Sequence, residues 1–229
     1  MLCSWEKLPD FMRTKEVRPY YELLRKHRFG LLMKRTFDFV MSSIMLVLLA
    51  PVFLFLTIWI KTDSEGPIFY RQERVTQYGR IFRIYKFRTM VQNADKIGSL
   101  VTVGGDSRIT KVGRKLRGCR LDELPQLINI WKGEMTFVGT RPEVAKYVKQ
   151  YTKEMYATLL LPAGVTSEAS IEFKDEDRLL NGVSGDEADR VYVGRVLPGK
   201  MRWNLEGIRE FSLCQEGLIL IRTLEAVLK

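Results

Sequence analysis

Residues 38–61, DFVMSSIMLVLLAPVFLFLTIWIK, decide more about this chain than any other stretch. Between Asp38 and Lys61 lie 22 residues without a single charge. The hydrocarbon core of a bilayer is about 30 Å thick, and roughly 20 apolar helical residues can cross it. The segment therefore predicts a membrane anchor. Pro51 lies near its middle, where the missing backbone N–H predicts a kink.

The residues alone leave two topologies open for this anchor. In the first, Pro51 is a tolerated kink in a straight span, since proline is more frequent in membrane helices than in soluble ones. In the second, the helix breaks at Ala50-Pro51, turns inside the leaflet and leaves on the side it entered. Both flanks are rich in Lys and Arg, so the usual charge asymmetry across a membrane is missing. Free backbone groups at a break would need polar partners, for which Ser42, Ser43 and Thr57 are the candidates.

Composition narrows the chemistry of the remaining residues, 62–229, which suffice for one compact domain. His27 is the only histidine and precedes the anchor, so a Ser-His-Asp or Cys-His nucleophile system is excluded from this domain. Cys3, Cys119 and Cys214 are widely separated, which argues against a disulfide framework or a zinc site and indicates a reducing location.

Positive charge is concentrated in one block of the chain. From Arg71 to Arg120 there are 13 basic and three acidic residues, and the difference equals the net charge of the whole chain, +10. Such a block attracts polyanions: nucleic acid, anionic lipid headgroups or phosphorylated substrates. A basic face resting on anionic lipid is equally consistent with this charge.

The pattern of residues predicts a small α+β assembly. Residues 68–75 and 81–88 are rich in aromatic and β-branched residues and predict two strands joined by a turn at 77–80. In the second strand the two-residue period places Lys86 and Arg88 on one face. Helices are expected over 111–120, 121–132, 147–161 and 205–228, and the last of these is amphipathic.

An acidic pair, Asp122 and Glu123, follows directly on Arg114, Lys115, Arg117 and Arg120. One interpretation is structural: Asp122 caps the helix that begins there, with Pro125 in its first turn. The other is chemical, because carboxylates ringed by cations should stay ionised. Such a pair can bind Mg²⁺ together with substrate phosphates, and an aspartate can attack phosphorus. Phosphoryl transfer of this kind needs no histidine.

Seven motifs then follow in order: KRTFDF, the apolar segment with its central proline, GPIFYRQERV, FRIYKFRTM, SRITKVGRKLR, LDELPQLINIWKGEM and FVGTRPE. In this order the chain resembles the bacterial sugar transferases, the monotopic polyprenyl-phosphate phosphoglycosyl transferases, over about residues 33–228. The resemblance implies a re-entrant membrane helix over 33–61, broken at Ala50-Pro51. A small mixed α/β catalytic domain over 62–229 follows, on the cytoplasmic face, with amphipathic helices at the membrane surface. Residues 1–32 form a basic N-terminal extension outside the resemblance.

The resemblance also implies an activity and its residues. A sugar-1-phosphate would pass from a UDP-sugar to undecaprenyl phosphate, with release of UMP, as a first membrane step of bacterial surface glycan synthesis. Asp122 would be the nucleophile that forms a covalent phosphosugar intermediate, and Glu123 would assist it; both would bind Mg²⁺. The phosphate- and nucleotide-binding residues would be Lys86, Arg88, Arg117, Arg141, Pro142 and Lys174. Expected partners are UDP-sugar, undecaprenyl phosphate and membrane phospholipid, not nucleic acid, with a homodimer as a further option.

The chain departs from the common family pattern at two places. Thr140 replaces the first proline of a G-P-R-P motif, and Ala163–Ser167 replaces P-G-I-T-G. Two alternatives are kept beside the transferase interpretation. One is a membrane-tethered basic module that binds nucleic acid or anionic lipid without catalysis, and the other is a transferase that moves a whole sugar and releases UDP.

Overall fold

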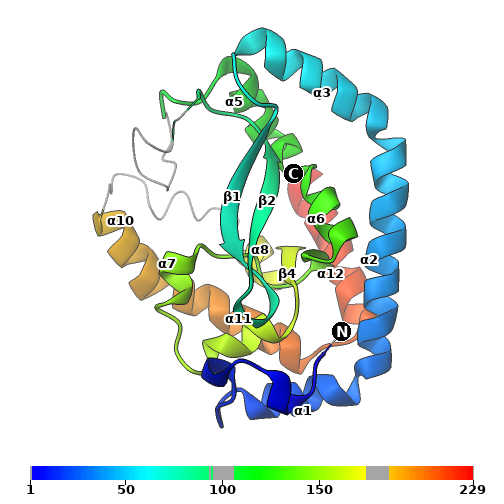
Figure 1. Ribbon diagram of the computed structural model, residues 1–229, viewed down its shortest axis with the longest axis vertical. Coiled ribbons are helices and arrows are strands. Elements are labelled where there is room, and N and C mark those ends of the chain that lie inside the picture. The colour runs from blue at the N-terminus through cyan, green and yellow to red at the C-terminus, as the bar shows by residue number, and fades with distance from the viewer. Residues whose placement is uncertain (1, 93, 95–105, 174–185, 229) are drawn as a thin grey trace.

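The computed structural model describes residues 2–92, 94, 106–173 and 186–228 (Figure 1). It is a mixed α/β structure with two small sheets, as the sequence predicts at that level. Strands β1 (Phe69–Val75) and β2 (Ile81–Phe87) form an antiparallel hairpin. Strands β3 (Met135–Val138) and β4 (Ala163–Thr166) form a parallel pair.

Helices surround these strands on several sides. The α-helices are α1 (Arg18–Lys26), α2 (Arg28–Leu48), α3 (Ala50–Asp63), α5 (Lys111–Gly118), α6 (Gln126–Lys132), α7 (Ala145–Val148), α8 (Glu168–Glu172), α10 (Asp186–Val191), α11 (Leu197–Arg209) and α12 (Leu213–Leu228). Short 3₁₀ turns are η1 (Trp5–Lys7), η2 (Asp10–Met12), η3 (Gln77–Gly79), η4 (Leu121–Glu123) and η5 (Met155–Leu160), and η6 (Tyr192–Val196) is a π-helical turn.

The predicted hairpin is confirmed, with Phe69 opposite Phe87 and Val75 opposite Ile81. Its turn contains two residues with positive φ, Tyr78 at 61° and Gly79 at 75°. A residue other than glycine seldom adopts this conformation. The Tyr78 hydroxyl is held by the backbone N–H of Cys3, 2.9 Å away, so a contact from the N-terminal segment accompanies the unusual turn.

Helices α2 and α3 form an arch along one side of the molecule (Figure 1). Neither helix is long and apolar enough to cross a membrane by itself, but the pair passes the same length and composition test with a bend of 60°. The break falls at Leu49, one residue before the predicted Ala50-Pro51. Pro51 has no N–H to give to the carbonyl four residues earlier and its ring crowds that carbonyl, so the helix bends just before it.

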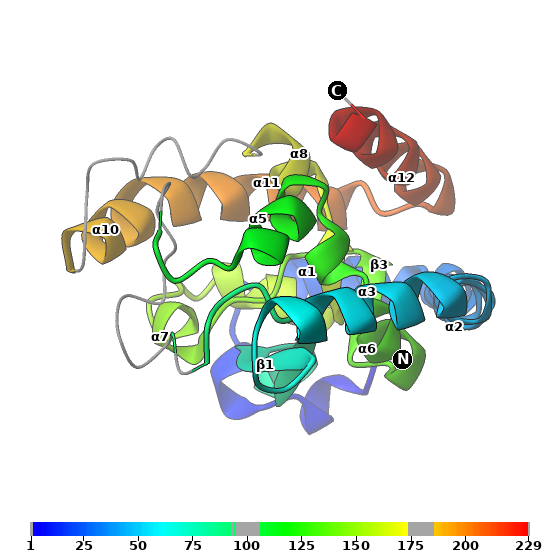
Figure 2. The ribbon, with the colours of Figure 1, turned by 90° about the horizontal axis from the view of Figure 1, so that it is seen from above.

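The arch exposes large apolar side chains along most of its length. They are Phe29, Leu32, Met33, Phe37, Phe39, Val40, Ile44, Val47, Leu48, Val52, Leu54, Phe55 and Ile58. Ser42 and Ser43 both donate to the carbonyl of Phe39, within the helix rather than at the break. Seen from above, α12 lies on the side of the arch away from β1 (Figure 2), and Lys34 of α2 donates to Glu216 of α12 at 2.6 Å.

The polar residues of KRTFDF attach α2 to the globular part. The buried Asp38 carboxylate accepts from Thr136 Oγ1 at 2.6 Å and from the backbone N–H of Phe137 at 3.2 Å. Lys34 donates to the carbonyl of Val138 at 2.8 Å, and Arg35 donates to the last carbonyls of α6. Buried polar groups cost free energy unless they are paired. These contacts therefore fix α2 against β3 and α6.

The N-terminal extension belongs to the same core as the globular part. In α1, Tyr20, Tyr21 and Leu24 are buried in a cluster with residues of η5 and α11. The Tyr20 hydroxyl donates to Glu154 at 2.6 Å and accepts from Arg209 at 2.7 Å. The helix over 18–26 therefore packs on its own chain.

Two predicted helices are each divided in the structure. Residues 147–161 contain α7 and η5 with a separate turn between them, where the Thr152 hydroxyl accepts from the backbone N–H of Met155 at 3.3 Å. Residues 205–228 are split between α11 and α12, and Ser212 Oγ accepts from the N–H of Gln215 at 3.1 Å. Hydroxyl side chains compete with the helix for backbone donors, so each break coincides with a local cap.

Candidate active site

Asp122 and Glu123 lie on the turn that joins α5 to α6. Arg120, directly before this turn, has φ of 55°, a left-handed conformation that is uncommon for any residue except glycine. Strained backbone of this kind is frequent at functional sites. The predicted cap is wrong: Asp122 is inside the 3₁₀ turn η4, and its side chain caps no helix.

Glu123 is held between two cations from distant parts of the chain. Lys86 of β2 donates to Glu123 Oε1 at 2.8 Å, and Arg141, from the loop after β3, donates to both carboxylate oxygens. Burial acts to raise the pKa of Glu123, yet Arg141 and Lys86 together hold that pKa well below its usual range. Glu123 therefore stays ionised and ties β2 and the Arg141 loop (residues 139–144) to η4.

Asp122 has a different environment from its neighbour. It is buried, and burial raises the pKa of its carboxyl above the usual range, against the opposing effects of Lys86 and Arg117. Within the described part of the chain, no other side chain donates a hydrogen bond to it or forms an ion pair with it. Asp122 thus has no side-chain partner among the described residues, whereas both oxygens of Glu123 are engaged.

Arg117 is positioned by α5. Its Nε donates to Thr89 Oγ1 at 2.9 Å. The helix comes close to the chain after β2, because a Cβ at Gly113 would lie 2.1 Å from the carbonyl oxygen of Thr89. Lys86, Arg117 and Arg141 supply three positive charges around the two carboxylates, so the group is net positive and suits a phosphate-bearing ligand.

Not every predicted residue joins this group. Arg88 lies beyond the end of β2, and its guanidinium donates to the Ser64 carbonyl and to Ser64 Oγ at 3.0 Å, in the loop after α3. Pro142 contributes its carbonyl, which accepts from Arg74 at 3.1 Å. Lys174 lies outside the described residues.

Two residues that the sequence analysis does not single out support the site. Arg74 donates to the Pro142 carbonyl, beside Arg141, and Asn129 joins two elements. The fully buried Asn129 amide accepts from the backbone N–H of Tyr85 at 2.9 Å and donates to the Arg83 carbonyl at 3.0 Å. It thereby joins α6 to the strand that carries Lys86. Its signal in the sequence is a polar residue inside an apolar helix, where a buried amide has to find partners.

The buried face of α6 is partly polar. Leu121, Leu124, Ile128 and Trp131 recur at helical spacing, but Trp131 is exposed and stacks with Phe39 of the arch. The buried face of α6 carries Gln126, Leu127, Asn129 and Ile130 instead.

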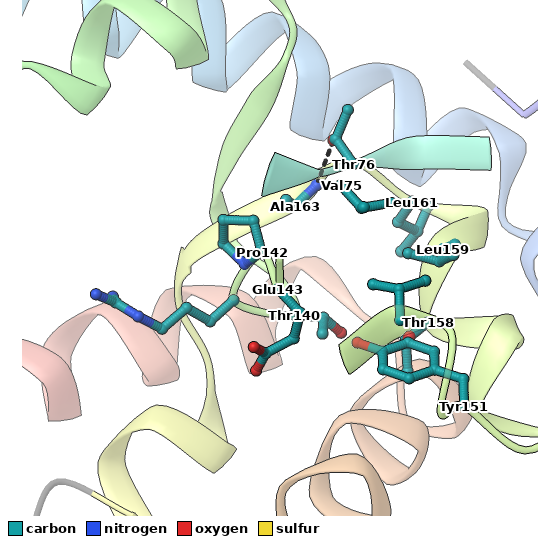
Figure 3. A pocket seen from close by; sticks show the side chains of 12 residues that line it. Val75, Thr76, Thr140, Pro142, Glu143, Tyr151, Thr158, Leu159, Leu161 and Ala163 are labelled. Carbon is teal, nitrogen blue, oxygen red and sulfur yellow. Dashed lines mark hydrogen bonds between the residues drawn. The ribbon is translucent and has the colours of Figure 1, made fainter. Parts of the chain in front are cut away.

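Two hollows in the described part of the chain are lined by residues other than the acidic pair. One, of about 240 Å³, is lined by Arg141, Pro142 and Glu143 together with residues of β1 and η5 (Figure 3). The other, of about 570 Å³, lies between the loop after β3, α11 and α12. Neither lining includes Asp122 or Glu123. The chemistry of the pair is therefore inferred from its charges and contacts.

The acidic pair fits one kind of metal ion. Within the described residues, no cluster of three or more His, Cys, Asp or Glu side chains could hold an ion. Mg²⁺ needs less, because it binds through one or two carboxylates and takes further ligands from substrate phosphates and water. Asp122 has no side-chain partner among the described residues that would compete for this, while the oxygens of Glu123 already accept from Lys86 and Arg141. A Mg²⁺ ion that binds mainly to Asp122 and to a diphosphate matches this donor set.

Several known proteins are similar to the chain. One is the UDP-N-acetylgalactosamine-undecaprenyl-phosphate N-acetylgalactosaminephosphotransferase of Aeromonas hydrophila, 35% identical over 199 residues, which are 85% of this chain and 43% of that protein. Another is the UDP-glucose:undecaprenyl-phosphate glucose-1-phosphate transferase of Escherichia coli K12, 35% identical over 186 residues, 80% of this chain and 37% of that protein. A protein of the same description from Caulobacter vibrioides is 33% identical over 200 residues, 86% of this chain and 70% of that protein.

The chain spans less than half the length of the first two of these relatives. Residues 29–229, which hold the arch, both sheets and the Asp122-Glu123 pair, match the family described as bacterial sugar transferase. The chain belongs to the bacterial sugar transferase family.

Proposed function

We propose that the chain transfers a sugar-1-phosphate from a UDP-sugar to undecaprenyl phosphate and releases UMP. The observation that carries this proposal is the pair of adjacent carboxylates, one engaged and one uncommitted, among Lys86, Arg117 and Arg141. The names of these three relatives, each of which specifies undecaprenyl phosphate, support the choice of substrates. Such a transfer is a first membrane step of surface glycan synthesis.

Asp122 acts as the nucleophile in the proposed reaction. Its carboxylate oxygen forms a bond to the β-phosphorus of the UDP-sugar while the bond from that phosphorus to the bridging oxygen breaks, and UMP leaves with the bridging oxygen. A phosphate oxygen of undecaprenyl phosphate then attacks the same phosphorus and releases Asp122. The product is an undecaprenyl diphosphosugar. The cations beside Asp122 offset the negative charge on the equatorial phosphate oxygens in both steps.

Glu123 orients the cations in this scheme. With Lys86 Nζ at 2.8 Å and Arg141 on both of its oxygens, it fixes two of the three positive groups that would meet the diphosphate. Mg²⁺, held by Asp122 and the diphosphate, would supply further charge neutralisation when bound. Arg117 would hold a phosphate oxygen from the α5 side.

For the arch, we propose a re-entrant anchor in the cytoplasmic membrane, with the globular part on the cytoplasmic face. The bend of 60° at Leu49 and the Lys- and Arg-rich segments on both sides of the arch support this arrangement. The acceptor lipid and the UDP-sugar could then meet at the same surface.

The contacts of the basic block argue against a binding module as the primary function. Several of its cations are committed to partners inside the protein: Lys86 to Glu123, Arg88 to Ser64, Arg108 to Asp106, and Arg117 to Thr89. A surface that binds nucleic acid would present such groups to solvent.

Nucleotide release tests the proposed reaction. Detergent-solubilised protein with Mg²⁺, undecaprenyl phosphate and a panel of UDP-sugars should release UMP with at least one donor. Release of UDP would instead show transfer of the whole sugar. Absence of either product, together with salt-sensitive binding of nucleic acid regardless of its sequence, would favour the binding module.

Replacement Asp122→Asn should lower UMP release by about 10³-fold or more, because the amide cannot serve as the nucleophile. Wild-type protein incubated with a radiolabelled UDP-sugar and no lipid acceptor should retain label after denaturation, and Asp122→Asn should retain none. Asp10→Asn, at an exposed aspartate in η2, is the matched control and should behave as wild type. Label retained by Asp122→Asn would assign the nucleophile elsewhere.

Removal of divalent cations should abolish turnover. EDTA is expected to stop UMP release, and Mg²⁺ in excess is expected to restore it, since the donor set at Asp122 suits a magnesium diphosphate. The melting temperature should be unchanged by EDTA, because the fold described here contains no metal cluster among the described residues. Full turnover in EDTA would remove the metal from the mechanism.

Cysteine labelling tests the anchor. The background variant has Cys3, Cys119 and Cys214 replaced by serine. Single cysteines are then introduced by Thr36→Cys, before the break at Leu49, and by Glu65→Cys, after it. Both positions are exposed. An impermeant thiol reagent should reach both in inverted membrane vesicles and neither in intact spheroplasts. Labelling from opposite sides would establish a straight span.

A further inference from the structure

A second buried carboxylate lies two residues after Arg141. Glu143 is 7% exposed, and its Oε1 accepts the hydroxyl proton of Tyr192. Glu143 is the last residue of the FVGTRPE motif, and it has no role in the reaction proposed above. Burying a carboxylate is costly unless it is paired. The hydrogen-bond partners of Glu143 therefore indicate which parts of the chain its carboxylate holds together.

Three hydrogen bonds to its backbone already restrain the Arg141 loop. Arg74 donates to the Pro142 carbonyl at 3.1 Å, and Gly164 N–H donates to the Thr140 carbonyl at 2.8 Å. The Glu143 carbonyl accepts from the N–H of Val75 at 2.9 Å. Figure 3 shows Thr140, Pro142 and Glu143 along this one segment beside the end of β1. The backbone on both sides of Arg141 is thus held by β1 and β4.

The Glu143 side chain adds a tether to a distant part of the chain. Tyr192 is buried and begins the π-helical turn η6, between α10 and α11. π-helical turns are rare in proteins, and those that occur are often found at functional sites. The buried Lys200 of α11 places its Nζ 3.4 Å from the Tyr192 hydroxyl and 5.4 Å from the centre of the ring. Carboxylate, phenol and ammonium therefore form a continuous buried chain from the Arg141 loop to α11.

We propose that Glu143 and Tyr192 are positioning residues that hold the Arg141 loop against α11 and thereby aim Arg141 at the diphosphate of the donor. This inference rests on the proposed function. In this proposal Arg141 donates to Glu123 on one side and to a substrate phosphate on the other. A misplacement of about 1 Å in such a group can cost about 100-fold in rate.

Tyr147 provides a matched control. It is buried in the same aromatic cluster, with its ring centre 4.6 Å from that of Tyr192. Its hydroxyl donates to Asp189 of α10 at 2.6 Å. Both tyrosines thus donate to a carboxylate, but only the partner of Tyr192 lies in the Arg141 loop.

The test compares Tyr192→Phe with Tyr147→Phe, each alone and combined with Arg141→Ala, by UMP release and by thermal melting. Tyr192→Phe should lower kcat roughly 10- to 100-fold with little change in KM, because Arg141 would be misaimed in the transition state. Tyr147→Phe should keep kcat near that of wild type, with a similar change in melting temperature. In the Arg141→Ala background, Tyr192→Phe should have no further effect on kcat, since the two residues act through one contact.

Glu143→Gln provides a second test, because the amide oxygen of glutamine can still accept a hydrogen bond from Tyr192. It should retain more activity than Glu143→Ala. Equal losses from Tyr192→Phe in both backgrounds, or from both tyrosine variants, would overturn the positioning role and leave the proposed function standing. Wild-type protein that releases no UMP would overturn the proposed function itself, and the positioning role with it.

Discussion

The Glu123 carboxylate brings together three segments that are far apart in the chain: β2 through Lys86, η4 itself, and the loop after β3 through Arg141. Its side chain is only 13% exposed, so its charge depends on both cations for compensation. Loss of one partner from a buried ion pair leaves an unpaired charge and costs about 3–5 kcal/mol. The relative positions of Lys86, Arg141 and Asp122 therefore depend on this one carboxylate.

The two adjacent carboxylates have opposite electrostatic environments, and this difference separates their roles. Ion pairing holds the pKa of Glu123 well below its usual range, whereas burial raises the pKa of Asp122. Titratable neighbours with pKa values pushed apart are characteristic of acid, base and nucleophile assignments. Here Glu123 is paired with two cations, whereas Asp122 has no side-chain partner among the described residues. Positive charge arriving beside Asp122 would lower the pKa of its carboxyl and favour the ionised form.

Local features of the structure follow from the sequence, while several long-range ones do not. The β1–β2 hairpin and the break beside Pro51 are confirmed because alternation, turn residues and a missing N–H act within a few positions. The two-residue period predicts Lys86 and Arg88 on one face, but Lys86 contacts Glu123 whereas Arg88 turns to Ser64, since β2 ends at Phe87 and the period no longer applies. The split helices depend on single hydroxyl caps, and Asn129 and Glu143 acquire partners only through tertiary contacts, which no local pattern encodes.

The arch and the Arg141 loop share one short strand, β3. Asp38 of α2 accepts from Thr136 and Phe137 of β3, and Lys34 donates to the carbonyl of Val138, where that strand ends. Arg141 follows three residues later. The arch is thus joined to the Arg141 loop by buried polar contacts on a short strand, not by a flexible linker. Because an unpaired polar group in such a place would be costly, the arch cannot turn relative to β3 without breaking these contacts. The position of the Arg141 loop relative to the arch is therefore set by Lys34 and Asp38 of KRTFDF, just before the uncharged stretch of the arch begins.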